Sequence, residues 1–196
     1  MPPLRGARLE GDVTMRKSFG LTRLRAMPAP DVWHALPSSG LYAVAPGSTA
    51  TVRLNAEGLR SGDIAGLALL SVVAAAPAPR PFAWLGVSRG SDGFSLIRHV
   101  DRGGRTVRVT LGDRHVWLRA ECDFVRYDVG FFYSHDGRHY AGVGEPCPMV
   151  AGPHATEAVW CSPFSHAARG HVPGGHADFD SLLLTTKRAP RPDDGR

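Results

Sequence analysis

The chain has 196 residues, of which 43% are hydrophobic, and its formal net charge is +5. This hydrophobic content supports a packed core and excludes a wholly disordered chain, and the length suits one β domain. No apolar run reaches the ~18 residues of a membrane span, and residues 1–21 lack the apolar core of a signal peptide, so we expect a cytoplasmic protein without membrane contacts.

The first 48 residues are expected to form an irregular segment. Prolines interrupt them repeatedly, and no helical periodicity is visible. We expect residues 1–48 to wrap the surface of the domain that follows, as extended chain held by a few apolar side chains. The expected anchors are Trp33, Leu36, Leu41 and Tyr42.

The sequence of residues 49–186 predicts about ten short strands separated by turns. "TATVRLN" alternates cleanly between the two faces of a strand, and "IAGLALLSVV" is an apolar run of buried-strand length. Gly66 inside that run indicates a bend or a close approach of two backbones. The pattern predicts an all-β fold, a two-sheet antiparallel β-sandwich or jelly roll, and residues 187–196 are expected to be a flexible tail.

The basic residues are nearly all arginines, and many alternate with apolar residues, as in "TVRLN" and "TVRVTL". Such alternation is typical of the solvent face of a sheet, so we expect no nucleic-acid partner. The chain has three cysteines and no CxxC, which indicates neither a zinc ribbon nor a redox motif.

The strand "HVWLRAECD" places an aromatic residue among charges on one face. Trp117, Arg119 and Glu121 share that face, because side chains alternate along a strand. An indole offers a flat apolar surface to the C–H groups of a sugar, and the charged groups offer hydrogen bonds to hydroxyls. These three residues are the predicted carbohydrate contacts. The alternative is that Trp117 packs under the N-terminal segment.

The stretch "GFFYSHDGRHYAGVG" predicts a β-hairpin. Asp136-Gly137 suits a two-residue turn, which would bring Ser134 or His135 close to Arg138 or His139. A histidine pair without a third ligand is weak for zinc. We therefore interpret the hairpin as scaffold with surface histidines.

A calcium site is conceivable at Asp178 and Asp180. The two carboxylates lie on the same side of the last strand, and calcium prefers several oxygen ligands. The alternative is that they are polar residues at a strand start. No other cofactor is expected.

Catalytic motifs are sparse. A glycosidase needs two carboxylates in a fixed arrangement, and jelly-roll enzymes often place them as E-x-D-x-x-E. The one E-x-D here is Glu121-Cys122-Asp123, and Arg126 stands where the second Glu would be. No G-x-S-x-G, Walker or Rossmann motif is present, so we expect no catalytic residues.

Several phrases occur in an order typical of one enzyme family. They are "SGDIAGLALL", "FAWLGVSR", "VWLRAECD", "FFYSHDGRHYAGVGEP" and "GGHADFDSLLL". Together they resemble the concanavalin A-like C-terminal domain of β-xylosidases and arabinofuranosidases of glycoside hydrolase family 43. The resemblance covers about residues 49–186, and Tyr140 stands where that family commonly has Trp.

The resemblance implies a lectin-type sandwich beside a five-bladed propeller that carries the catalytic carboxylates. We expect no propeller within 196 residues. The predicted function is therefore a non-catalytic module that binds a xylan- or arabinan-derived saccharide or accompanies a family 43 propeller domain. The alternatives are a protein-docking subunit, a stand-alone small glycoside hydrolase, or a fragment of a longer gene product.

Overall fold

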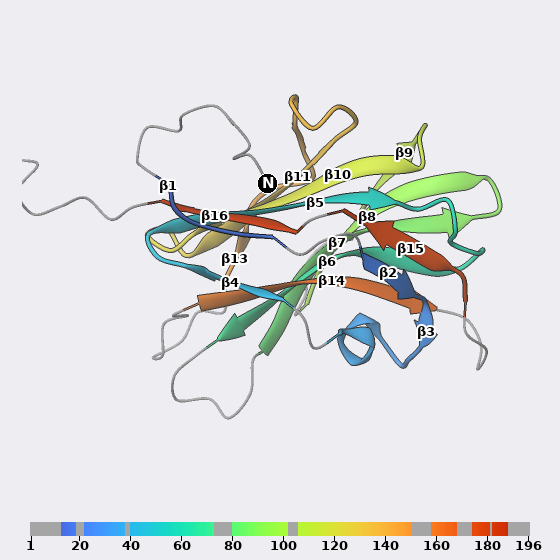
Figure 1. The fold of residues 1–196 in the computed structure, drawn as a ribbon, viewed down its shortest axis with the longest axis horizontal. Helices are drawn as coiled ribbons and strands as arrows, with labels where there is room; N and C mark the ends of the chain where they lie inside the picture. The colour runs from blue at the N-terminus through green and yellow to red at the C-terminus, as the bar shows by residue number, and fades with distance from the viewer. Residues whose placement is uncertain are drawn as a thin grey trace, which may run out of the picture.

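A computed structural model describes residues 13–18, 22–37, 40–72, 80–101, 106–149, 158–167, 174–180 and 182–187. Within these residues the chain forms two β-sheets that stack face to face (Figure 1). The predicted all-β, two-sheet sandwich is confirmed. No α-helix occurs in the described residues, and no helical segment there has the length and apolar character needed to cross a bilayer.

The first sheet has nine described strands. Its main path runs β1 (Val13–Ser18), β16 (Leu183–Lys187), β5 (Gly47–Asn55), β10 (His115–Asp123), β11 (Asp128–Ser134) and β12 (Ala141–Gly142). Beside this path, β13 (Cys147–Pro148) pairs with β11, while β15 (His176–Phe179) pairs with β5 and with β2 (Thr22–Arg25). All of these pairs are antiparallel.

The second sheet has seven described strands. Its path runs β3 (Met27–Pro28), β14 (Ala158–Ala167), β6 (Asp63–Val72), β7 (Arg80–Gly90), β8 (Gly93–Val100) and β9 (Val107–Leu111), and β4 (Leu41–Val44) also pairs with β14. Only the short β3–β14 pair is parallel. Between the partners β4 and β3, one edge of β14 has no described partner strand, and Pro163 lies in that interval, where a strand tolerates proline.

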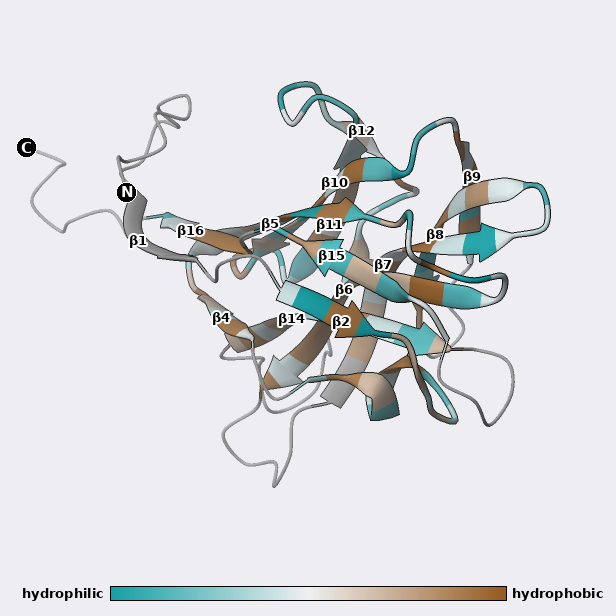
Figure 2. Ribbon diagram, turned by 45° about the vertical axis from the view of Figure 1, so that its right-hand side comes forward, coloured by the Kyte–Doolittle hydropathy of each residue, from teal (hydrophilic) through white to brown (hydrophobic). Residues whose placement is uncertain are grey.

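The core lies between the sheets. Hydrophobic and hydrophilic residues alternate in bands along several strands, as alternating burial requires (Figure 2). The largest fully buried side chains come from both sheets and include Phe131, Phe179, Leu54, Leu67, Leu85 and Leu118.

A second, smaller apolar cluster covers part of the outer face of the seven-stranded sheet. Here "outer" means the side turned away from the core. The 3₁₀ turn η1 (Val32–Ala35) lies on this face, and Asp31 caps it by accepting a 3.0 Å hydrogen bond from the backbone N–H of His34. The cluster comprises Val32, Ala68, Trp84, Ile97 and Phe164, with Trp33, Leu36 and Ile64 packed against it.

The N-terminal segment differs from the prediction. Its described residues contribute the strands β1 to β4 and the turn η1, so they are not irregular chain, although the division at residue 49 stays a prediction. Trp33, Leu36 and Leu41 are confirmed as anchors, but Tyr42 is wrong because it is 55% exposed. The predicted last strand is two strands, β15 and β16. Lys187, the first residue of the predicted tail, ends β16, and the rest of the tail lies outside the described residues.

Candidate functional site

The candidate site lies on the outer face of the nine-stranded sheet, where β10 is flanked by β5 and β11. The inward side chains of β10 are Val116, Leu118, Ala120 and Cys122, and all four are buried. The predicted alternation is therefore confirmed. It leaves the intervening side chains, Trp117, Arg119 and Glu121, on the outer face.

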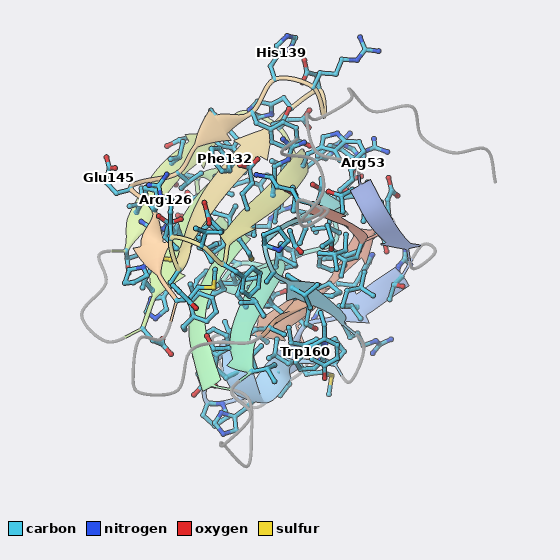
Figure 3. All side chains as sticks on the ribbon, turned by 90° about the vertical axis from the view of Figure 1, so that its left-hand side faces the viewer. Arg53, Arg126, Phe132, His139, Glu145 and Trp160 are labelled. Carbon is cyan, nitrogen blue, oxygen red and sulfur yellow. The ribbon has the colours of Figure 1, made fainter. Side chains whose placement is uncertain are left out.

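Strand pairing places further side chains beside these three. Across β5 and β10, Trp117 faces Arg53, Arg119 faces Thr51 and Glu121 faces Thr49. Across β10 and β11, Trp117 faces Ser134, Arg119 faces Phe132 and Glu121 faces Gly130. Beyond β11, Gly142 of β12 faces Phe132. We call this group of outward side chains the β10 face (Figure 3 labels Phe132 and Arg53).

Trp117 is half-buried because a loop lies on its ring. A Cβ on Gly137 would lie 2.7 Å from Cε2 and 2.9 Å from Nε1 of Trp117, so the backbone itself touches the indole. The Arg53 guanidinium lies 5.9 Å from the centre of the indole ring. The cover among the described residues comes from the loop of residues 135–139; residues 1–12, part of the N-terminal segment that the alternative prediction named, lie outside the described residues.

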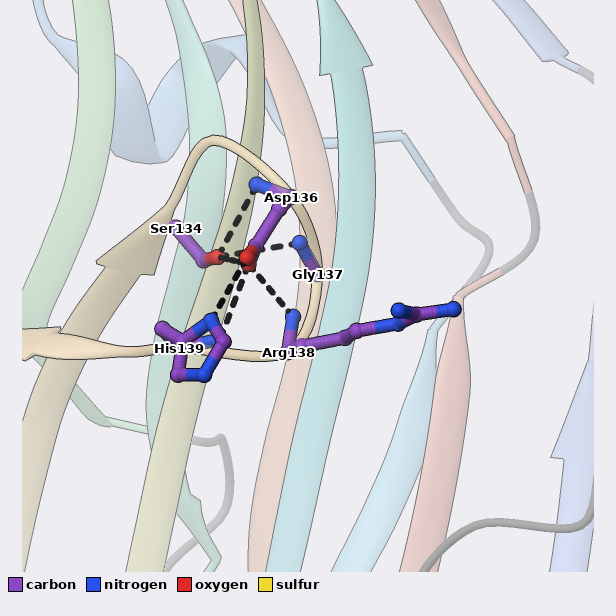
Figure 4. Close-up of polar contacts among 5 residues, drawn as sticks. All are labelled: Ser134, Asp136, Gly137, Arg138 and His139. Carbon is purple, nitrogen blue, oxygen red and sulfur yellow. Dashed lines mark hydrogen bonds and ion pairs between the residues drawn. The ribbon is translucent and has the colours of Figure 1, made fainter.

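The covering loop is organised by one carboxylate (Figure 4). Asp136 Oδ1 accepts hydrogen bonds from the backbone N–H groups of Arg138 at 2.7 Å and His139 at 2.8 Å, and from the Ser134 hydroxyl at 2.9 Å. Oδ2 lies 2.7 Å from the His139 ring Nδ1. These donors, led by the His139 backbone N–H, hold the pKa of Asp136 far below its ordinary value.

This geometry corrects the predicted hairpin. Phe132 pairs with Gly142 and Tyr133 with Ala141, so the connection runs from Ser134 to Tyr140 and is not a two-residue turn. The Asp136 carboxylate takes the place of strand pairing by collecting the free N–H groups of the loop. His135 and His139 are exposed, as predicted, and the loop that carries His139 projects from the sheet (Figure 3).

Arg119 lies flat against an aromatic ring. Its guanidinium carbon is 3.4 Å from the ring centre of Tyr140, and its Nη1 is 3.6 Å from Glu121 Oε1. Its Nε is buried without a hydrogen-bond partner among the described residues. Burial raises the pKa of Tyr140, although the positive charge of Arg119 opposes this effect.

Phe132 is a residue that the sequence interpretation missed. Its half-buried ring lies over two glycines: a Cβ on Gly130 would be 2.9 Å from Cε2, and a Cβ on Gly142 would be 3.9 Å from Cε1. The signal was present, because Gly130, Phe132 and Ser134 alternate with the buried Val129 and Phe131.

Asp178 and Asp180 each face an arginine. Asp178 accepts two hydrogen bonds from Arg23, at 2.6 Å from Nε and 2.9 Å from Nη2, and these hydrogen bonds lower its pKa against the effect of burial. Asp180 accepts one from Arg53 Nη1 at 2.9 Å. No group of three or more histidine, cysteine or acidic side chains arranged to hold a metal occurs in the described residues. Calcium binding at Asp178 and Asp180 stays a prediction.

The single E-x-D sequence serves a turn. Asp123 Oδ1 accepts hydrogen bonds from the backbone N–H groups of Val125 and Arg126, both at 2.9 Å, and so closes the connection from β10 to β11. Glu121, two residues earlier, faces Gly130 and approaches Arg119. Since Asp123 is committed to the turn, the pair does not resemble the two carboxylates of a glycosidase.

The fold is similar to parts of larger solved enzymes. A bifunctional GH43-CE protein of Bacteroides eggerthii matches with a TM-score of 0.67 and 23% identity, over 85% of this chain and 21% of that chain. A GH43 glycoside hydrolase engineered to display both endo-xylanase and exo-arabinofuranosidase activity matches at 0.65 and 19%, over 83% and 33%. A xylan β-1,4-xylosidase of Bacillus halodurans matches at 0.63 and 16%, over 83% and 32%.

These similarities concern the fold. The chain spans 21–33% of the length of these enzymes, and every identity is below 25%. No protein-family model and no curated protein matches the sequence. The chain is thus a β-sandwich of a kind that also occurs within GH43 enzymes, which supports the resemblance seen in the sequence at the level of the domain.

Proposed function

We propose that the chain is a non-catalytic β-sandwich module that accompanies a catalytic domain of glycoside hydrolase family 43 and binds a xylan- or arabinan-derived saccharide. The observation that carries this proposal is the pattern of coverage: 83–85% of this chain corresponds to only 21–33% of each GH43 enzyme. A module of this size corresponds to a part of those enzymes, and in its one E-x-D sequence Asp123 is engaged in a turn.

The β10 face is the proposed binding surface. It combines aromatic rings with charged groups that form hydrogen bonds in two directions: Arg119 donates and Glu121 accepts. Arg119 is rigid because Tyr140 supports its guanidinium, so little side-chain entropy is lost when it binds a hydroxyl. The surface is a face of a sheet, which suits weak binding along a polysaccharide.

Calorimetric titration with xylo- and arabino-oligosaccharides tests this proposal. The wild type should bind one series, and Arg119→Gln and Glu121→Gln should each weaken binding at least about tenfold, or ~1.4 kcal/mol. Arg126→Gln is the matched control, because Arg126 lies in the β10–β11 turn, where its Nη2 is 3.3 Å from Asp128 Oδ2, outside the β10 face. Equal binding by all variants would contradict the assignment of the face.

A catalytic assay separates the module from a small hydrolase. The purified chain should release no product from aryl-xylosides or aryl-arabinosides above the buffer rate. Hydrolysis that disappears in Glu121→Gln would contradict the non-catalytic assignment and favour the alternative of a stand-alone glycoside hydrolase.

A calcium site at Asp178 and Asp180 is a secondary part of the proposal. A bound ion would have to replace the hydrogen bonds from Arg23 and Arg53. If calcium binds there, millimolar calcium should raise the melting temperature of the wild type and leave that of Asp178→Asn/Asp180→Asn unchanged. A melting temperature that is insensitive to calcium in the wild type would exclude the site.

A further inference from the structure

The β10 face contains two aromatic rings that differ in accessibility. A ring that stacks on a sugar must present one open face, because the C–H groups of the sugar lie directly over it. Trp117 and Phe132 are both half-buried, so the fraction of exposed surface does not separate them. The two rings differ instead in which groups cover them.

Trp117 does not present an open ring face to a sugar. The backbone at Gly137 touches its five-membered ring and Arg53 approaches the same indole, while Asp136 holds the covering loop in place with four contacts. A sugar could reach the indole only if this loop moved away and lost those hydrogen bonds. Trp117 therefore supports the loop by packing against its backbone.

Phe132 lies against the backbone of the sheet. Added Cβ atoms on Gly130 and Gly142 would meet its ring, so the missing side chains of these two glycines leave room for it. Among the described residues no other aromatic ring and no guanidinium stacks on Phe132. Phe132 thus lacks, among the described residues, the kind of cover that the Gly137 backbone and Arg53 give to Trp117.

The polar groups of the site surround the same ring. Arg119 is the direct cross-strand neighbour of Phe132, and Glu121 faces Gly130, over which the ring lies. A sugar on the ring would have the Arg119 guanidinium and the Glu121 carboxylate at its edge, where equatorial hydroxyls point. The Arg119 side chain is 28% exposed on this border, so its guanidinium remains partly accessible to a ligand.

We propose that Phe132 is the stacking platform of the β10 face and that it selects pyranose rings whose hydroxyls are all equatorial. Such rings present only C–H groups on their faces and hydroxyls on their rims, which matches a flat ring bordered by a donor and an acceptor. An axial hydroxyl would point at the ring and lose its hydration. The inference rests on the proposed carbohydrate binding and names the residue and the sugar shape.

Calorimetry with xylohexaose and mannohexaose tests this inference, because mannose carries an axial hydroxyl. Phe132→Leu, which keeps apolar bulk, and Phe132→Ala should each bind xylohexaose at least about tenfold more weakly than the wild type. The control Tyr42→Ala, which removes an exposed aromatic ring from the other sheet, should bind within about threefold of the wild type. Mannohexaose should bind the wild type at least about tenfold more weakly than xylohexaose.

The outcomes separate the two proposals. If xylohexaose binds wild type and Phe132→Leu equally while Arg119→Gln loses binding, the platform is wrong and the proposed function stands. Equal affinity for the two hexaoses would overturn the selection of sugar shape. If no oligosaccharide binds the wild type, both the platform and the carbohydrate-binding function are overturned.

Discussion

Gly137 is the residue whose backbone allows the loop to rest on Trp117. Its φ is +72°, a conformation that residues with a side chain rarely adopt, and an added Cβ would lie 2.7 Å from the indole. Gly137→Ala should lower the free energy of unfolding by about 1–3 kcal/mol, as measured by urea denaturation. Trp117 fluorescence should shift to longer wavelength, because the loop would lift from the ring.

Gly112→Ala is the control for this substitution. Gly112 is exposed, no atom lies within 4 Å of its added Cβ, and its φ is not in the left-handed range. Its effect should stay within about 0.5 kcal/mol. Equal effects at the two positions would show that the loop tolerates a side chain and that Trp117 is not tightly covered.

Asp136 should give the loop a characteristic pH dependence. Its folded-state pKa is lowered by the N–H donors of Arg138 and His139, so the loop gains stability from the ionised carboxylate above the ordinary value of 3.8. This contribution is lost only as the pH falls below 3.8 toward the lowered folded-state pKa. In NMR spectra, the change that acid produces in the amide shifts of both residues should therefore have its midpoint below pH 3.8.

Asp136→Asn removes the charge from this network and is the matched variant. An asparagine still accepts hydrogen bonds through one oxygen, so the loop should persist while the acid-dependent change in the two amide signals disappears. A midpoint near 3.8 in the wild type would contradict the hydrogen-bond network around Asp136.

At the scale of elements, Gly66 decides how closely β6 and β7 approach. A Cβ there would collide with the Leu85 carbonyl oxygen and with the Gly86 Cα on the neighbouring strand. The close approach predicted from the sequence is confirmed. Gly66→Ala should therefore force the two central strands apart and reduce the free energy of unfolding by about 1–3 kcal/mol, measured by thermal and urea denaturation.

Gly90→Ala, at the end of β7, provides the comparison. Only Gly93 O and Asp92 N lie near its added Cβ, at 3.8 and 4.0 Å, so an alanine fits without displacement. A loss at Gly66 no larger than the loss at Gly90 would mean that the spacing of β6 and β7 is not fixed by Gly66.

The sequence predicts the long strands better than the short ones, for a physical reason. The strand β10 has nine residues with one buried face, so its own alternation identifies it. The strands β1 and β2 have six and four residues and exist because they pair with β16 and β15 from the other end of the chain. The local sequence of a short strand does not reveal a partner strand that lies far away in the chain.

The candidate site also has features that the sequence predicts and features that it does not. The outward positions of Trp117, Arg119 and Glu121 follow from alternation, and their common face was predictable. The loop that covers Trp117 was not predictable from the sequence. It depends on hydrogen bonds to the Asp136 carboxylate, which stabilise a longer loop in place of a two-residue turn. The contact of Phe132 with Gly142 depends on the register between β11 and β12, and no sequence pattern determines that register.

At the scale of the whole molecule, each of the two sheets contributes a buried thiol to the shared core. Cys122 belongs to β10 of the nine-stranded sheet and Cys161 to β14 of the seven-stranded sheet, and both are buried in the one core cluster. The hydrogen bond with the Cys161 thiol, followed by burial, raises the pKa of Cys122. Burial also raises the pKa of Cys147, against the opposing effect of Arg98.

The raised thiol pKa values predict that the sandwich loses stability in alkali. In the folded state Cys122 and Cys147 stay protonated above the ordinary thiol pKa of ~8.5, whereas the unfolded chain ionises there. Their contribution is fully present below that pH and is lost as the pH rises through the folded-state values. The free energy of unfolding should therefore be lower at pH 9.5 than at pH 7.5, measured by urea denaturation under reductant.

The double variant Cys122→Ala/Cys147→Ala isolates the thiols from other groups that titrate in alkali. It should be less stable than the wild type at pH 7.5, because two buried side chains are shortened. Between pH 7.5 and 9.5 it should lose less stability than the wild type, since it lacks the two thiols. An equal loss in both proteins would mean that these thiols ionise in the folded sandwich as readily as in the unfolded chain, and that the core around them admits water.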